Sequence, residues 1–287
     1  MKHKLAMYYE KLDNERVHCL LCPQNCFIKQ DGTGACRARK NIEGDLYSLN
    51  YGRITSISLD PIEKKPLNRF HPGSMILSAG TFGCNLKCAF CQNWTIAHTD
   101  PETADLLPPK LIAEALKLKP HGNIGIAYTY NEPTIWFEYV LESAKLAKEN
   151  DLLNVLVTNG FIRQEPLLEL IPYIDAMNID VKAFTEDFYS KICGGKLEHV
   201  IRTVEAAANK CHVEVTTLVI PGLNDSIEDI GALSKWLASI SPEIALHLSR
   251  FFPNYKMQDK PPTPGETLLR AKEKALENLK HVYIGNM

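Results

Sequence analysis

The sequence predicts an α/β fold in which short buried strands alternate with helices to form a partial (β/α)6 barrel. From Met75 onward, apolar runs alternate with helix-like stretches, which is the pattern of βαβ units and a parallel sheet. The runs are nearly continuous in hydrophobicity, and this suits strands buried on both faces better than a half-exposed sheet. The predicted strands are Met75–Thr81, Ile124–Tyr128, Asn154–Thr158, Ala176–Val181, Val213–Ile220 and Ile244–Leu248, with a final strand at Val282–Gly285.

Helices are predicted between these strands, at Pro109–Lys117, Ile135–Glu149 and Ile227–Ile240 among others. Residues 1–74 differ from the rest because Pro, Gly and Asp break them into turns and four cysteines are grouped there. We therefore expect two parts, a cysteine-rich metal-binding region at 1–74 and a TIM-like partial barrel at 75–287.

Composition excludes some classes of partner. The 287 residues include 32 Lys and Arg against 34 Asp and Glu, and a net charge of -2 gives no basic surface for nucleic acid. Residues 1–19 lack the apolar core of a signal peptide, and no apolar run approaches the ~18 residues of a membrane span. We expect a cytoplasmic protein that binds neither membranes nor nucleic acid.

Cys84, Cys88 and Cys91 follow the first predicted strand with the spacing Cys-x3-Cys-x2-Cys, in GCNLKCAFCQNW. Barrel enzymes hold their catalytic groups at the carboxyl ends of the strands, which is where these thiols fall. Three thiolates suit an iron–sulfur cluster with one open iron better than a closed zinc site, and Phe90 is placed to shield the cluster from water. The alternative is a zinc site that borrows a histidine such as His98.

This spacing, with an aromatic residue before the last cysteine, resembles the signature of the radical S-adenosylmethionine (radical SAM) superfamily. The resemblance implies a [4Fe-4S] cluster on Cys84, Cys88 and Cys91 whose open iron binds S-adenosylmethionine (SAM). It also implies reductive cleavage of SAM to a 5′-deoxyadenosyl radical that abstracts hydrogen from a substrate. A dry barrel mouth suits such chemistry, because a primary carbon radical attacks almost any C–H bond.

The same resemblance implies several SAM-binding residues. TYNEPT, at 129–134, stands where the superfamily has Gly-Gly-Glu-Pro, so Glu132 and Pro133 match while Tyr130 and Asn131 replace the glycines. The alternative for this segment is a helix start capped by Asn131.

IDVKAF, at 179–184, is similar to a strand end of glycyl-radical-enzyme activases, where Asp180 and Lys182 help to bind SAM. Both side chains lie on one face of the predicted strand, and the alternative is a mutual salt bridge. Three further segments complete the implied SAM site. VTNG supplies Thr158 and Asn159, LVIPGLND supplies Ile220 near adenine, and FFPNYK has Asn254 in place of the SAM-binding histidine of the activases.

Cys19, Cys22, Cys26 and Cys36 form a second group that completes a tetrahedral set of thiolates. Zinc and a second iron–sulfur cluster both fit, and either would stabilise a region too short to build its own core. The isolated Cys193 and Cys211 are expected to be small buried hydrophobic residues.

Together with LDPIEKKPLNRFHPGS, at 59–74, the cysteine-rich start resembles the radical SAM enzyme of the AmmeMemoRadiSam system. That resemblance implies partners from the Memo and AMMECR families and supplies no substrate. Lys64, Lys65 and His71 either line the barrel mouth or form a solvated basic loop.

We expect an enzyme that acts on a small organic substrate, with an electron donor such as flavodoxin or ferredoxin. The first alternative is an activating enzyme that installs a glycyl radical on a partner protein. The second alternative is a non-catalytic metal-binding interaction module.

Overall fold

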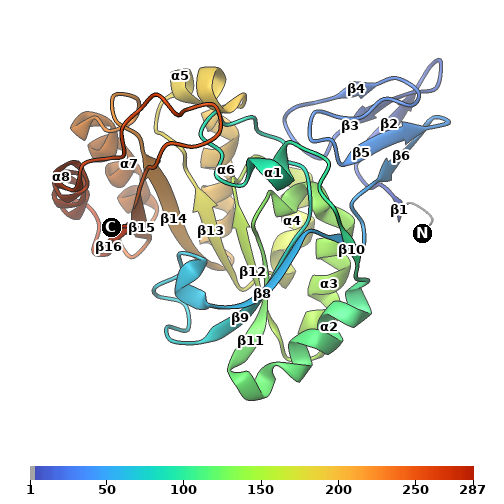
Figure 1. Ribbon diagram of the computed structural model, residues 1–287, viewed down its shortest axis with the longest axis horizontal. Helices are drawn as coiled ribbons and strands as arrows, with labels where there is room; N and C mark the ends of the chain where they lie inside the picture. The colour runs from blue at the N-terminus through green and yellow to red at the C-terminus, as the bar shows by residue number, and fades with distance from the viewer. Residues whose placement is uncertain (1–3) are drawn as a thin grey trace.

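The computed structural model describes residues 4–287 and contains one large sheet whose outer face is covered by helices (Figure 1). The strand order is β16-β15-β14-β13-β12-β11-β9-β8. Successive strands from β9 to β16 pair in parallel, and β8 pairs antiparallel with β9. The strands are β8 (Ser56–Pro61), β9 (Met75–Gly80), β11 (Asn123–Tyr128), β12 (Leu153–Thr158), β13 (Ala176–Asp180), β14 (His212–Val219), β15 (Ala245–Arg250) and β16 (Val282–Gly285).

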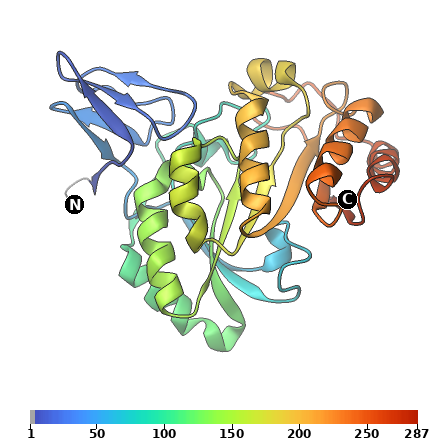
Figure 2. The same cartoon turned by 180° about the vertical axis from the view of Figure 1, so that it is seen from behind.

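Helices follow the parallel strands and lie along one face of the sheet (Figure 2). They start where the sequence favours it: Pro108 occupies the first turn of its helix, and Ser226 caps another by accepting the Asp229 N–H at 3.0 Å. The helices are α1 (Trp94–Ala97), α2 (Pro108–Lys117), α3 (Phe137–Glu149), α4 (Gln164–Leu170), α5 (Glu186–Phe188), α6 (Leu197–Ala208), α7 (Ile227–Ile240) and α8 (Gly265–Leu276).

The sheet separates two groups of buried apolar side chains. The larger group joins the strands to the helices, as expected for strands with two buried faces. The smaller group, which includes Ile62, Leu67, Ile76 and Val155, contains side chains from the strands and from the segment after β8. That segment, residues 62–74, is defined here as the plug segment, because Leu67 fills space against the sheet.

Polar contacts hold the plug segment at the amino-terminal end of β14 (Figure 1). The Glu214 carboxylate accepts the backbone N–H groups of Asn68 and Arg69 at 3.1 and 2.8 Å. Farther along the sheet, the Asn178 side chain donates to the Pro66 carbonyl at 2.8 Å. Residues 66–69 of the plug segment therefore lie against the amino-terminal half of β14 and the middle of β13.

The amino-terminal part forms small sheets beside the main one (Figure 1). It contacts the helical layer through the buried ion pair between Arg39 and Glu138. Gln24 also donates to the backbone carbonyls of Asn85 and Gly194, both at 2.7 Å. The elements are β1 (Lys4–Leu5), β2 (Tyr9–Leu12), β3 (Arg16–Cys19), β4 (Phe27–Ile28), β5 (Arg39–Ile42), β6 (Asp45–Ser48) and β7 (Arg53–Ile54), the last paired with β10 (Ala104–Asp105).

The predicted partial α/β barrel with a cysteine-rich start is confirmed, and each predicted strand has a counterpart within a residue or two. The main sheet also includes β8, which lies inside the region expected to be separate, so the sheet begins before residue 75. The division at residue 74 stays a prediction. Residues 1–3 of the charged amino-terminal stretch lie outside the described residues. In the part of the chain that the structure describes, no helix is long and apolar enough to cross a membrane.

Candidate functional site

A cavity of about 350 Å³ lies at the carboxyl-terminal part of the parallel strands. Its wall brings together residues on or just after the seven parallel strands β9 and β11 to β16, as the fold class predicts. The expected site residues that line it are Cys84, Cys88, Phe90, Cys91, Asn131, Glu132, Asn159, Asp180 and Lys182.

Four other expected residues do not line this cavity. Pro133 starts a buried 3-10 turn, and Thr158 points its hydroxyl at Glu132 instead of into the cavity. Ile220 is buried in the core and donates its N–H to the Asn224 side chain at 2.6 Å. Asn254 lines a neighbouring hollow.

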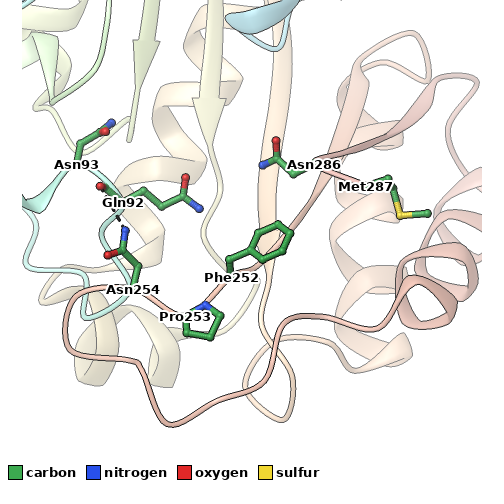
Figure 3. A pocket seen from close by; sticks show the side chains of 7 residues that line it. All are labelled: Gln92, Asn93, Phe252, Pro253, Asn254, Asn286 and Met287. Atoms are coloured by element: carbon green, nitrogen blue, oxygen red, sulfur yellow. Dashed lines mark hydrogen bonds between the residues drawn. The ribbon is translucent and has the colours of Figure 1, made fainter.

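That hollow has a volume of about 640 Å³ and adjoins the cavity, since Gln92, Asn93 and Asn286 line both (Figure 3). Asn254 donates to the Gln92 carbonyl at 3.4 Å. The exposed ring of Phe252 adds an apolar surface. The hollow thus offers side-chain amides next to an apolar face.

His98, the alternative zinc ligand, stacks on Tyr255 with 5.6 Å between ring centroids.

The loop that holds Cys84, Cys88 and Cys91 is fixed at its start by Asn131. The Asn131 side chain accepts the Thr81 N–H at 3.1 Å and donates to the Gly83 carbonyl at 2.8 Å. Gly83 has a φ of +91°, which only glycine adopts without strain. A side chain in place of the superfamily's glycine therefore orients the backbone that leads into Cys84.

A second amide network holds the loop from the side of β12. Asn85 donates to the Phe161 carbonyl at 2.7 Å and accepts from Asn159 at 2.9 Å. The same Asn159 side chain lies 3.7 Å from the Cys84 sulfur. Because an amide N–H beside a thiolate stabilises its negative charge, this contact favours the thiolate form of Cys84.

The far side of the loop rests on one turn of π-helix at Tyr189–Cys193. The carbonyl of Cys193 accepts the Lys87 N–H at 2.7 Å, and that of Ile192 accepts the Ala89 N–H at 3.2 Å. The buried Cys193 thiol lies within hydrogen-bonding reach of Cys88. A turn of this rare helix type often marks a functional position.

The three thiols differ in their acidity. Burial raises the pKa of Cys84 well above its usual range and raises that of Cys91 to about 11. The hydrogen bond with Cys193, aided by the charge of Lys182, lowers the pKa of Cys88. Cys84 and Cys91 are therefore neutral at pH 7 unless a cation holds them as thiolates.

Glu132 is the buried acceptor at the centre of the site. Its Oε1 accepts the Thr134 N–H at 2.9 Å and the hydroxyls of Thr134 and Thr158, both at 2.7 Å. Its Oε2 accepts the Asn159 N–H at 2.7 Å, and a carboxylate oxygen has capacity for one more donor. Burial raises the pKa of Glu132, although these donors oppose the shift.

Asp180 and Lys182 form a salt bridge with 2.7 Å between Oδ2 and Nζ, and both also line the cavity. The mutual salt bridge is therefore present, and SAM binding by this pair stays a prediction. Burial lowers the pKa of Lys182, but the Asp180 carboxylate and the Cys88 sulfur outweigh it and raise the pKa overall. Lys182 is a permanent cation beside the cysteines.

The four amino-terminal cysteines are gathered near the same loop. Cys19, Cys22 and Cys36 are buried, and Cys26 is half-buried. Burial, together with the nearby Cys19 and Cys26, raises the pKa of Cys36 to about 11. A Cβ on Gly83 would lie 2.5 Å from the Cys36 carbonyl, so this group packs directly against the backbone before Cys84.

Thiolates are soft ligands that suit iron–sulfur clusters and zinc, and each group of cysteines is chemically able to hold one. In the described range 4–287, no group of three or more His, Cys, Asp or Glu side chains is arranged to hold a metal ion. The fit of a cluster therefore rests on the donor set and on the cavity that all three loop cysteines share.

Sequence reasoning missed part of the cavity wall. Gln92 and Asn93 directly follow Cys91, and their position next to a predicted site residue indicates that they line the cavity. Thr216 lies two residues before Leu218 on β14, so strand alternation places both on the cavity face. Ser249 and Asn286 carry no sequence signal. Lys64 and Lys65 line the cavity, whereas His71 is exposed and is not part of its wall.

Comparisons with known proteins identify the family of this chain. A family model described as the radical SAM superfamily matches residues 79–234. A protein of Methanocaldococcus jannaschii without an assigned function is 43% identical over 98% of this chain and 85% of its own length. Another protein of that organism, named as a glycyl-radical enzyme activating enzyme, is 26% identical over 70% of this chain and 77% of its own length.

Among solved structures, a radical SAM methyltransferase from Sphaerobacter thermophilus shares the fold with a TM-score of 0.58. It is 14% identical, and the match covers 98% of this chain and 77% of that structure. The family match runs from the end of β9 into α7 and spans more than half of the chain. This chain therefore belongs to the radical SAM superfamily.

Proposed function

We propose that this protein cleaves SAM reductively at a [4Fe-4S] cluster held by Cys84, Cys88 and Cys91, and that a small organic molecule loses hydrogen to the product radical. The observation behind the proposal is that the three thiols share one cavity with Glu132 and with the Asp180–Lys182 pair. When bound, the cluster supplies one electron to the SAM sulfonium, which yields methionine and a 5′-deoxyadenosyl radical.

The chain's own residues have separate tasks in this proposal. Glu132 uses the remaining acceptor capacity of Oε2 to hold the amino group of SAM. Asp180 and Lys182 exchange part of their mutual salt bridge for the charged or hydroxyl groups of the same ligand. Asn159 and Asn131 hold the cysteine loop in place, and Phe90, which is buried, keeps water from the thiolates.

Electron spin resonance tests this assignment. After anaerobic reconstitution with iron and sulfide and reduction with dithionite, we expect a [4Fe-4S]⁺ signal that changes when SAM is added. A Cys84→Ala, Cys88→Ala, Cys91→Ala triple variant should show no signal that responds to SAM, whereas Cys211→Ala, which changes a thiol remote from the cavity, should retain the response. Recovery of zinc alone from the reconstituted wild-type protein would contradict the proposal and favour a non-catalytic interaction module.

The same proposal includes an electron donor, partner proteins and a class of substrate. The electron comes from a reduced flavodoxin or ferredoxin in a cytoplasmic protein, and proteins of the Memo and AMMECR families are its proposed partners. The substrate is a small molecule, because the volume of the cavity, about 350 Å³, lies near the lower end of the ~300–1,000 Å³ range of small-ligand sites.

A second candidate function is the installation of a glycyl radical on a partner protein. The open hollow beside the cavity favours it, since its side-chain amides and exposed Phe252 are groups that can contact a peptide. A stable glycyl radical signal on a candidate partner, formed only with SAM and the intact cysteine loop, would establish this function. Consumption of a metabolite without such a signal would exclude it.

For the amino-terminal cysteines, we propose zinc or a second iron–sulfur cluster as a structural centre. The support is the four thiols, three of them buried, in a part of the chain with only short strands. Metal analysis of the Cys84, Cys88, Cys91 triple variant should still find zinc, or iron with sulfide. A Cys19→Ser, Cys22→Ser variant should lose that metal, and retention of it would contradict the proposal.

A further inference from the structure

We infer that Lys64, supported by Lys65, Asp60 and Tyr130, binds an anionic group of the substrate. This inference rests on the proposed function and adds the chemical class of the substrate, a small molecule that carries a carboxylate or a phosphate. The four side chains are defined here as the anion wall. Lys64, Lys65 and Tyr130 line the same cavity as the cluster cysteines.

Hydrogen bonds connect three side chains of the anion wall. Asp60 is buried and accepts from the Lys65 ammonium at 2.8 Å and from the Tyr130 hydroxyl at 2.9 Å, both on Oδ2. The Lys65 Nζ also lies 4.9 Å from the centre of the Tyr130 ring. Lys65 is only 3% exposed, so its position is fixed by these contacts.

Lys64 differs from Lys65 because it is free to meet a ligand. Its Nζ lies 3.6 Å from Asp60 Oδ1, which is too far for a hydrogen bond, and its side chain is 67% exposed. One carboxylate therefore faces two ammonium groups, and one positive charge remains on this side of the cavity. The buried hydroxyl of Ser78, on β9, lies beside Asp60 and Tyr130 and adds a further polar group to this side of the cavity.

The remaining charged groups of the cavity are matched. Asp180 and Lys182 neutralise each other at 2.7 Å, and the Glu132 carboxylate is surrounded by four protein donors. SAM itself brings an ammonium, a carboxylate and a sulfonium to that part of the site. The excess cation at Lys64 is not needed to balance any of these groups.

The position of Lys64 suits a substrate that extends along the cavity. In the β8–β9 hairpin, Pro61 pairs with Met75 and Ser56 pairs with Gly80. Lys64 follows β8 near the amino end of β9, whereas Cys84 lies beyond the carboxyl end of β9. A molecule held by its charge at Lys64 directs its uncharged part toward the cysteines, where hydrogen is abstracted.

Tyr130 links this wall to the departure from the superfamily motif. Tyr130 stands where the first glycine is expected and has a φ of +71°, an unusual conformation for an aromatic residue. The neighbouring Gly80 makes room for it, because a Cβ there would approach the Tyr130 side chain to 2.9 Å. Strain that is retained in this way commonly serves a function, and here it aims the hydroxyl at Asp60.

Calorimetric titration of the anaerobically reconstituted, SAM-bound protein tests the inference. The probes are succinate and inorganic phosphate, which separate the two anion types, and neutral succinamide as a matched control. At least one anion should bind wild type, and Lys64→Ala should weaken it about tenfold, the scale of one charged hydrogen bond. Lys64→Arg should restore binding, and Lys117→Ala, which changes an exposed lysine on α2, should leave it unchanged.

Equal binding of both anions to wild type and Lys64→Ala, or equal weakening in Lys117→Ala, overturns the inference, as does succinamide binding as tightly as succinate. The 5′-deoxyadenosine released by wild type is measured in the same samples. If wild type releases none under reduction, the proposed function fails, whatever the titration gives. If it releases 5′-deoxyadenosine but binds neither anion, only the substrate class is wrong.

Discussion

At the scale of single residues, Glu132 has a structural role and, in our proposal, a ligand-binding one. Its buried carboxylate ties the turn after β11 to the end of β12 through Thr134, Thr158 and Asn159. A buried acceptor with four donors has little freedom to move. The side chain that we assign to the amino group of SAM is therefore already held in position before the ligand arrives.

We predict that Glu132→Gln weakens SAM binding at least tenfold. Glutamine lacks the negative charge, and its NH₂ group would face a hydrogen-bond donor, so the free energy of unfolding should also fall by about 1–3 kcal/mol. Calorimetric titration with SAM and urea unfolding measure the two effects. Glu114→Gln, at an exposed position on α2, is the matched control, and SAM binding as tight in Glu132→Gln as in wild type would contradict the assignment.

At the scale of elements, the plug segment depends on one carboxylate. Glu214 accepts the two backbone N–H groups of the plug segment and also pairs with His212 at 2.9 Å and His247 at 2.6 Å. Burial raises its pKa, but the contacts with His212 and His247 outweigh burial and lower the pKa to about 2. The plug segment, which also holds Lys64, is thus anchored by an ionised group.

We predict that this anchor is lost in acid. The unfolded chain titrates near ~4.3, so Glu214 contributes stability that is complete above that pH and disappears as the pH falls toward 2. The contribution is about 2 kcal/mol after allowance for partial solvation. Urea unfolding between pH 6 and pH 2.5 should show wild type converging on Glu214→Gln as the pH falls. A constant difference between the two would contradict this account.

A second element-scale contact joins the amino-terminal sheets to α3. Arg39 and Glu138 are both almost fully buried, and Glu138 also accepts the Met7 N–H at 2.7 Å. Removing one partner of a buried ion pair leaves an uncompensated charge. This pair therefore fixes the cysteine-rich region against the barrel.

We predict that Arg39→Ala lowers the free energy of unfolding by about 3–5 kcal/mol. The exposed pair between Lys117 and Glu114 provides the comparison, because Lys117→Ala should cost no more than about 1 kcal/mol. Urea unfolding of both variants under one set of conditions measures the two changes in the free energy of unfolding. Similar effects for the two substitutions would show that the buried pair does not join the two parts.

At the scale of the whole molecule, the sequence predicts what depends on local pattern. Continuous apolar runs predict the positions of the strands. The three cysteines predict the position of the cavity, because parallel strands bring their carboxyl ends to one edge of the sheet. The sequence does not predict strand β8, because its half-exposed residues SISLDP resemble those of a surface loop. Its pairing with β9 becomes visible only when the chain has folded.

The contacts that define the site in detail are long-range and could not be derived from spacing. Cys193 lies beside Cys88 although more than a hundred residues separate them, and Tyr130 reaches Asp60 across the sheet. Asn131 stands in place of a motif glycine and makes two side-chain hydrogen bonds to the cysteine loop. A comparison of sequence motifs does not show these hydrogen bonds. Departures from a family motif are therefore interpretable only with their partners in view.

The most direct test of the central claim is product analysis with SAM and dithionite under anaerobic conditions. The account predicts that the reconstituted wild-type protein releases 5′-deoxyadenosine and methionine in equal amounts, and that the Cys84→Ala, Cys88→Ala, Cys91→Ala variant releases neither. Absence of both products from a wild-type protein that holds a reduced four-iron cluster and binds SAM would contradict it.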